Sequence, residues 1–171
     1  MSSQQAEGQW QEQRVLLAME RAVARQLDAL IHSAGQTILL LRDDRVMRQS
    51  QLRNALGVAT GKGQESLAAT TNFLRYQIGR SGGNQAWLHN DFGHKVISAL
   101  ESDAGIVSKL ATAVANEVGS IAPSVGRDQV FRQARLELAR LYLGYLDRWF
   151  RYGSAERRNW DDIEAATKES K

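Results

Sequence analysis

Two histidines and an aspartate lie close together in the run His89-Asn-Asp-Phe-Gly-His94. These side-chain types are ligands for transition metals. On a helix, His89 and His94 would lie about 140° apart and Asp91 about 200° from His89. A helical segment would therefore point the three side chains in different directions, and we expect no metal site here. A small enzyme that uses His89, Asp91 or His94 is kept as a third hypothesis for the function.

A second run, Gly57-Val-Ala-Thr-Gly-Lys-Gly63, is similar to a loop that binds phosphate through glycine backbone and a lysine. It has three residues between the first two glycines instead of four, and no serine or threonine follows Lys62. It also follows a helical pattern rather than a strand, so we interpret it as a flexible turn. The serine and carboxylate hydrolases need partner side chains that are not recognisable here. The sequence predicts no enzyme, no catalytic residue, no metal and no cofactor.

Basic residues suggest binding instead. Seventeen of the 22 basic residues are arginine, and six basic residues lie between Arg45 and Arg80 against one acid, Glu65. Arginine presents a planar fork that binds phosphate and stacks on bases, which favours a nucleic-acid backbone. Tyr76 lies between Arg75 and Arg80, a combination suited to single-stranded nucleic acid. Two alternatives stay open: the arginines form an ordinary solvated surface, and Tyr76 is a half-buried core residue.

Composition limits the class of protein. The chain has 171 residues, of which 24% are charged and 43% hydrophobic, as expected for one globular domain. It has no cysteine, which excludes disulfides, thiolate metal sites and cysteine nucleophiles. No apolar run approaches the ~20 residues that cross a bilayer, and no secretion signal is visible. We expect a cytoplasmic protein.

The spacing of apolar residues predicts how these side chains are positioned. A single proline and apolar residues three or four apart indicate an all-α protein: a single-domain helical bundle of about five to six helices over residues 1–153. Residues 154–171 are a polar tail or a short docked helix. The segment 37–47 is either helix or a short strand, and Gly35 is expected to end the first helix. The expected helices cover residues 10–32, 50–59, 64–78, 85–100, 107–118 and 127–152.

The long C-terminal helix expected over residues 127–152 is apolar on more than one side. It is either the central helix or part of an interface, because one partner layer cannot cover it. Gly144 within it suggests close approach by another helix or backbone. Trp87 and Trp149 fall in apolar helical patterns, so we interpret them as core or interface residues rather than stacking platforms.

Two short motifs resemble a known family. They are Gln49-Ser-Gln-Leu-Arg-Asn54 and Phe73-Leu-Arg-Tyr-Gln-Ile-Gly-Arg80, which resemble the small helical subunit of type III CRISPR-Cas effector complexes. In that family, threonine-serine-x-leucine/isoleucine-arginine starts one helix, and tyrosine-x-alanine-glycine-arginine ends a later one. The first motif matches at Ser50, Leu52 and Arg53 but has Gln49 for threonine, and the second matches at Tyr76, Gly79 and Arg80 but has Ile78 for the small residue.

The resemblance covers residues 50–80 and implies a non-catalytic subunit, present in several copies along guide and target RNA inside an antiviral ribonucleoprotein. Its partners would be the RNA backbone, other effector subunits and copies of itself. The alternative hypothesis is a helical adaptor or scaffold that joins proteins through residues 127–152 without nucleic acid. The matched arginines, their acid-poor neighbourhood and the interleaved tyrosine give the predicted RNA-binding residues: Arg48, Arg53, Lys62, Arg75, Tyr76 and Arg80.

Overall fold

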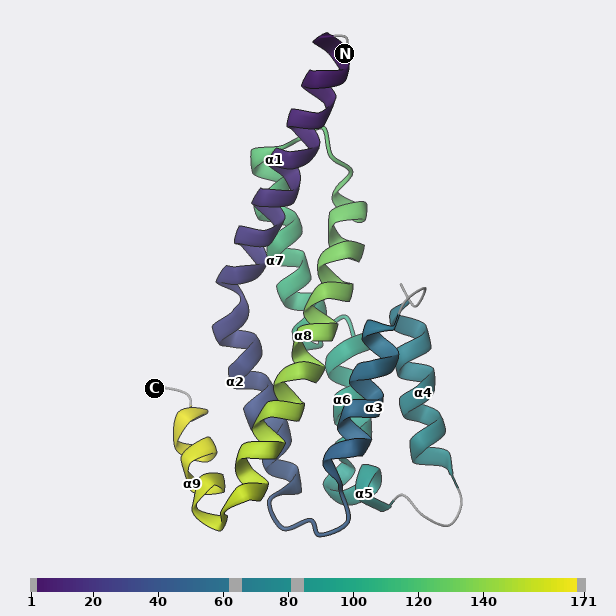
Figure 1. Cartoon of the computed structure of the whole chain (residues 1–171), viewed down its shortest axis with the longest axis vertical. Helices are drawn as coiled ribbons and strands as arrows, with labels where there is room; N and C mark the ends of the chain where they lie inside the picture. The colour runs from purple at the N-terminus through teal and green to yellow at the C-terminus, as the bar shows by residue number, and fades with distance from the viewer. Residues whose placement is uncertain (1–2, 62–65, 81–84, 169–171) are drawn as a thin grey trace.

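The computed structural model describes residues 3–61, 66–80 and 85–168, and every regular element in these ranges is helical (Figure 1). The predicted all-α class is therefore confirmed. The elements are α1 (Ser3–Arg25), α2 (Leu27–Ile38), the 3-10 helix η1 (Leu39–Leu41), α3 (Gln49–Thr60), α4 (Leu67–Gly79), α5 (Gln85–Leu88), the 3-10 helix η2 (His89–Asp91), α6 (Phe92–Glu101), α7 (Ile106–Ile121), α8 (Arg127–Ala155) and α9 (Arg157–Ala166).

The structure has more helices than the five to six predicted, because expected helices are interrupted. The helix expected over residues 10–32 breaks at Gln26, whose N–H donates to the Val23 carbonyl over 2.9 Å in the i→i−3 pattern of a tight turn. The helix expected over 85–100 is divided among α5, η2 and α6. Residues 37–47 complete α2, form η1 and then turn, so they are not a strand.

Gly35 does not end a helix, as the sequence suggested, but lies inside α2 where α2 meets α8. A Cβ at this position would lie 3.3 Å from the Trp149 ring nitrogen and would clash with Thr167. The Trp149 ring N–H donates to the Ile31 carbonyl over 3.1 Å. A side chain at this position would first meet the Thr167 methyl group and would also crowd the Trp149 indole, so glycine lets both lie against the α2 backbone.

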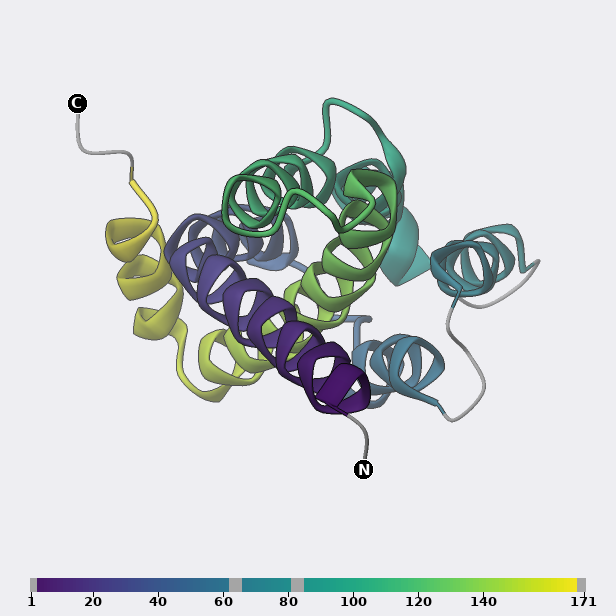
Figure 2. The ribbon, with the colours of Figure 1, turned by 90° about the horizontal axis from the view of Figure 1, so that it is seen from above.

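Helix α8 is the centre of the bundle, with α7, α2, α3 and α9 packed around it (Figures 1 and 2). Leu138, Tyr142 and Leu146 on α8 have no exposed surface. The Tyr142 hydroxyl donates to Thr37 Oγ1 on α2 over 2.8 Å. The central position of α8 explains why it is apolar on two sides, because different helices cover these sides.

Helices α3, α4 and α6 form a second layer beside the lower half of α8 in Figure 1. α3 and α4 run antiparallel as a helical hairpin, and α4 also packs on α6. Leu52, Leu74, Trp87 and Phe92 are at most 2% exposed in this layer. Of the two tryptophans predicted to be core or interface residues, Trp87 is fully buried, and Trp149 is partly buried and packs against the core.

The turn before α6 does not have the helical geometry expected for the His89–His94 run. Asn90 and Asp91 have φ values of 47° and 61°, in the left-handed region that interrupts a helix. His94 Nδ1 lies 2.8 Å from Asp91 Oδ1, whereas His89 Nδ1 lies 3.7 Å from Asp44 Oδ1. The two histidines therefore have different carboxylate neighbours and do not form one cluster.

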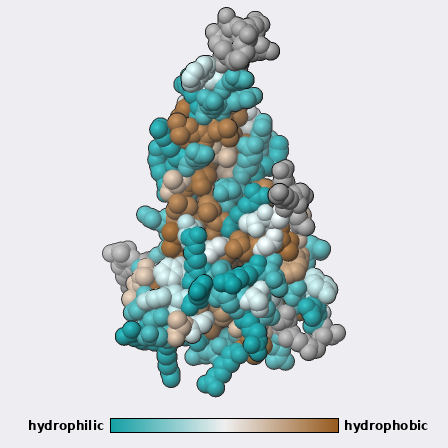
Figure 3. Space-filling view, viewed as in Figure 1, coloured by the Kyte–Doolittle hydropathy of each residue, from teal (hydrophilic) through white to brown (hydrophobic). Residues whose placement is uncertain are grey.

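Helix α1 extends past the rest of the bundle (Figure 1). Between α1, α2 and α8 lies a groove of about 630 Å³ with a mixed lining: apolar side chains such as Met19, Val23 and Leu136, and the polar side chains of Glu20, Gln133, Glu137 and Arg140. Leu16 and Leu17, just before the groove on α1, are 56% and 47% exposed. Figure 3 shows hydrophobic surface along this part of the molecule. The uncovered apolar surface therefore involves α1 as well as α8.

Residues 157–166 form α9, which packs on α8 and α2. Ile163 and Trp160 are buried in this contact. Of the two alternatives for the C-terminal segment, the structure has a docked helix. Gly153 permits the close contact, because a Cβ there would lie 2.8 Å from the Trp160 ring.

Gly144 and Gly153, both on α8, give a first prediction. No atom outside the adjacent helix backbone lies within 4 Å of a Cβ built at Gly144, so the close approach expected there is not made within the described chain. We expect Gly144→Ala to raise the free energy of unfolding by about 0.5–1 kcal/mol, because alanine loses less backbone entropy. Gly153→Ala should lower it, because the Trp160 ring has to move. Urea denaturation measures both, and destabilisation by Gly144→Ala would contradict the prediction.

Candidate nucleic-acid interface

The α3–α4 hairpin, taken with its flanking residues as 48–80, exposes a basic surface without acidic side chains in its described part. The single acid of this stretch, Glu65, and the predicted RNA-binding residue Lys62 lie outside the described residues. The side chains exposed beside the arginines are small or neutral, such as Asn54 and Asn72. Because α3 and α4 are antiparallel, the start of α3 and the end of α4 lie at the same end of the hairpin (Figure 1). Arg48 and Arg53 from one segment and Arg80 from the other therefore belong to one end.

Arg53 has one acidic neighbour, on α8. Its Nε lies 3.9 Å from Asp147 Oδ1, and the Arg53 side chain is 56% exposed. Asp147 is more tightly bound to Gln49, whose side-chain amide donates to both its carboxylate and its backbone carbonyl. The Arg53 contact is long and solvent-screened, so it leaves guanidinium N–H groups free to bind an anion.

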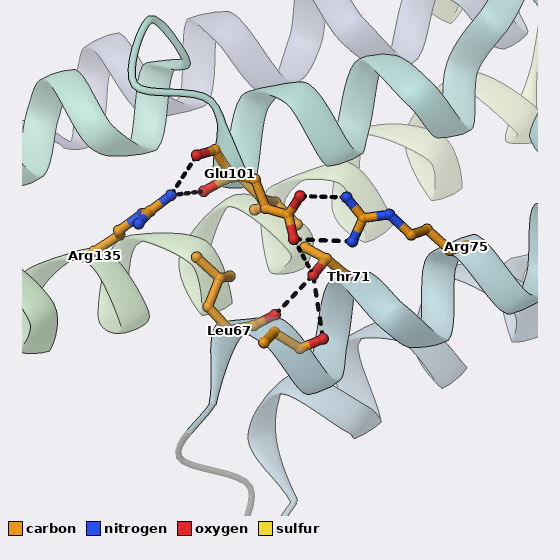
Figure 4. Close-up of polar contacts among 7 residues, drawn as sticks. Leu67, Thr71, Arg75, Glu101 and Arg135 are labelled. Carbon is orange, nitrogen blue, oxygen red and sulfur yellow. Dashed lines mark hydrogen bonds and ion pairs between the residues drawn. The ribbon is translucent and has the colours of Figure 1, made fainter.

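Unlike Arg53, Arg75 forms a close ion pair, because Glu101 at the end of α6 balances its charge. Both guanidinium NH₂ groups donate to the Glu101 carboxylate, one over 3.0 Å, and the Thr71 hydroxyl contacts the same carboxylate (Figure 4). The hydrogen bond from Arg75 is the main reason that the pKa of Glu101 is lowered. The same bond raises the pKa of Arg75.

Arg135 connects the same end of α6 to α8. Its guanidinium donates to the backbone carbonyls of Leu100 and Glu101 over 3.4 and 2.5 Å (Figure 4). These carbonyls are at the C-terminal end of α6, where helix carbonyls lack intrahelical partners and cations are favourable. Arg135 and Arg75 thus join the end of α6 to α8 and α4.

Tyr76 is 60% exposed, which decides against a core role for this residue. The Arg80 guanidinium carbon lies 5.8 Å from the centre of the Tyr76 ring, within cation–π distance. The pair presents an aromatic face and a positive charge to solvent at the end of α4. Such a surface can stack a base and bind its phosphate.

Arg140 on α8 has a structural contact with the hairpin that sequence spacing did not reveal. Its Nε donates to the Ala59 carbonyl in the last turn of α3 over 2.8 Å. A basic side chain at this end of a helix satisfies a carbonyl that has no helical partner. Together with the Gln49–Asp147 contact, it fixes both ends of α3 on α8.

The surface presents guanidinium groups and one aromatic ring to solvent. Within the described ranges, no group of three or more histidine, cysteine or acidic residues could hold a metal ion. Among the same residues, no helix is long and apolar enough to cross a membrane. The structure brings Arg48, Arg53, Tyr76 and Arg80 to one end of the hairpin, places Arg75 against Glu101, and leaves Lys62 undescribed.

Comparisons of the chain with protein-family models, curated proteins and solved structures found no match.

The Arg75–Glu101 pair predicts a dependence of stability on pH. The pKa of Glu101 is lowered from its usual 4.5 in the folded chain, so the unfolded chain binds this proton more readily. The stabilisation is therefore present above pH 4.5 and is lost as the pH falls through the folded-state pKa. We expect Glu101→Gln to lower the free energy of unfolding at neutral pH, with a smaller difference from the wild type in acid.

Urea denaturation at neutral pH and at about pH 3 tests the direction in which this stability difference changes with pH. Glu12→Gln, at an exposed position on α1, is the matched control. The prediction would be contradicted if the difference in the free energy of unfolding between Glu101→Gln and the wild type became larger on acidification.

Proposed function

We propose that this protein is a non-catalytic subunit that binds the backbone of RNA through the α3–α4 hairpin. The observation that carries the proposal is the end of the hairpin with three exposed arginines, Arg48, Arg53 and Arg80, and the exposed ring of Tyr76. Planar guanidinium groups bind phosphate oxygens in pairs of hydrogen bonds. Contacts of this kind hold a strand without reading its sequence.

The larger setting that we propose is a CRISPR-type ribonucleoprotein effector complex in the cytoplasm. It follows from the resemblance at residues 50–80, in which Arg53 and Arg80 match the family motifs. Several copies would lie side by side along guide and target RNA, each contributing its hairpin. An all-helical chain without a recognised catalytic group suits such a structural role in antiviral defence.

Removing two of the arginines gives the direct test. We expect Arg53→Ala/Arg80→Ala to weaken binding to single-stranded RNA and to reduce the slope of log K against log salt concentration by about 1.4, at about 0.7 per lost phosphate contact. Fluorescence anisotropy with a labelled oligoribonucleotide at several salt concentrations measures both quantities.

Arg127→Ala/Arg132→Ala is the matched control, because it removes two exposed arginines from the start of α8, far from the hairpin (Figure 1). An equal loss of slope in both variants would show only a general charge effect. An unchanged slope in the hairpin variant would overturn the proposed surface.

A second candidate function is the helical adaptor or scaffold that acts without nucleic acid. This candidate is favoured by the exposed Leu16 and Leu17 and by the apolar part of the neighbouring groove between α1, α2 and α8. Apolar surface of this kind typically marks a protein contact. The surface differs from that expected from the sequence, since α1 contributes to it and most of α8 is covered.

For this candidate, we expect the purified protein to self-associate without RNA, and Leu16→Glu/Leu17→Glu to abolish the association because two charges replace apolar side chains. Sedimentation equilibrium over a range of protein concentrations measures it. Gln9→Glu/Gln13→Glu adds the same charge at exposed α1 positions and is the control. A wild-type chain that stays monomeric would contradict self-association through this surface.

A further inference from the structure

A small cleft lined by aromatic rings lies between α2 and the C-terminal half of α8. Its volume is about 290 Å³, and its lining consists of Ile31, Tyr145, Arg148, Trp149 and Tyr152. The α8 residues have spacings of three, four and seven, so they lie on one side of the helix. This aromatic cleft is separate from the α3–α4 hairpin and contains none of the predicted RNA-binding residues.

Two of the rings are held in place by their polar atoms. The Trp149 ring N–H donates to the Ile31 carbonyl over 3.1 Å, and Gly35 makes room for the indole beside α2. The Tyr152 hydroxyl donates to Asp162 Oδ2 on α9 over 2.9 Å. Because these hydrogen bonds occupy the edges of the rings, the cleft is formed before a ligand arrives, and little ordering remains to be done on binding.

The chemistry of the lining favours a planar ring attached to a negative charge. Three aromatic side chains offer flat apolar surface, and Arg148 lies with its guanidinium carbon 5.4 Å from the centre of the Tyr145 ring. Arg148 is exposed and makes no ion pair among the described residues. A nucleobase with its phosphate has both features, since the base stacks on rings and the phosphate binds the guanidinium.

The surface of α8 leads from the hairpin to the cleft. Asp147 faces α3 and contacts Arg53, whereas Trp149 faces α2. We count angles around α8 from Asp147, at 100° per residue. Arg151, Gly144 and Arg148 then lie at about 40°, 60° and 100°. The three aromatic residues of the cleft lie further round, at about 140° to 200°. The strip between hairpin and cleft therefore carries two exposed arginines and a glycine with open space above it.

We propose that the aromatic cleft is a stacking site for one unpaired base of the RNA strand whose backbone the hairpin binds. The proposal depends on the proposed function, because it assumes that the strand crosses the α8 strip beside Arg53. Stacking is tolerant of base identity, since every base has a flat π face. The cleft would add affinity for unpaired, base-bearing strands, whereas the hairpin arginines bind any phosphate backbone.

The test compares two strands of equal length, a labelled oligoribonucleotide and the same sugar–phosphate chain without bases. We expect the wild-type full-length protein to bind the base-bearing strand about tenfold more tightly. Tyr145→Leu/Tyr152→Leu should remove most of this preference, chiefly by weakening the binding of the base-bearing strand. Arg53→Ala/Arg80→Ala should weaken binding of both strands. Tyr145→Phe keeps the ring against which Arg148 lies and should keep the preference, so it is the matched control.

Results that contradict the stacking site can be distinguished from results that contradict the proposed function. If both strands bind and the double leucine variant keeps the preference of the wild type, the stacking site is wrong and the backbone-binding function stands. If the wild type shows no preference for the base-bearing strand, the stacking site is also wrong. If neither strand binds at low salt, the proposed function is wrong and the stacking site falls with it.

A second measurement does not depend on the folding of the double leucine variant. Base stacking in the cleft should quench the fluorescence of Trp149, so unlabelled oligoribonucleotide should lower tryptophan emission in the wild type. The same titration of Trp149→Phe should show that this quenching is lost, and the abasic strand should cause none. Equal quenching in wild type and Trp149→Phe would overturn the proposal.

Discussion

The burial of α8 is the constraint on which the rest of the structure depends. This 29-residue helix is apolar on several sides, and no single partner can cover it. The structure surrounds it with α7, α2, α3 and α9, so that segments from both ends of the chain meet on one helix. Side chains such as Leu138 and Leu146 lose all contact with water there, and each fully buried leucine contributes about 1.5–3 kcal/mol of transfer free energy.

The same helix determines where the basic hairpin lies. Arg140 donates a hydrogen bond to the last turn of α3, and Asp147 accepts one from Gln49 in the first turn of α3. These contacts join residues 81 and 98 positions apart in the chain. Arg53 is therefore presented on a helix that is held at both ends, with Arg48 directly before its first residue. A rigid basic surface loses less conformational entropy when a phosphate backbone binds it.

Arginines in this chain have two distinct uses. Arg75 and Arg135 both bind the end of α6: Arg75 joins it to α4 within the second layer, and Arg135 joins it to α8. Arg48, Arg53, Arg80 and Arg148 are exposed, and an aromatic ring lies beside two of them. Basic residues that are close in sequence thus differ in their availability to a ligand, and the excess of arginine over lysine serves both uses, because only a planar fork makes paired hydrogen bonds.

The sequence alone determined the all-helical class, the buried stripe of α8, the core position of Trp87 and the scarcity of acids between Arg45 and Arg80. Apolar periodicity and charge are properties of one segment, so they can be read locally. Tertiary structure decided that Gly35 lies within a helix, that Tyr76 is exposed and that Arg75 is paired with a glutamate 26 residues away. It also formed the aromatic cleft from α2 and α8. These features depend on which helices come together, and the pattern along a single helix carries no information about its neighbours.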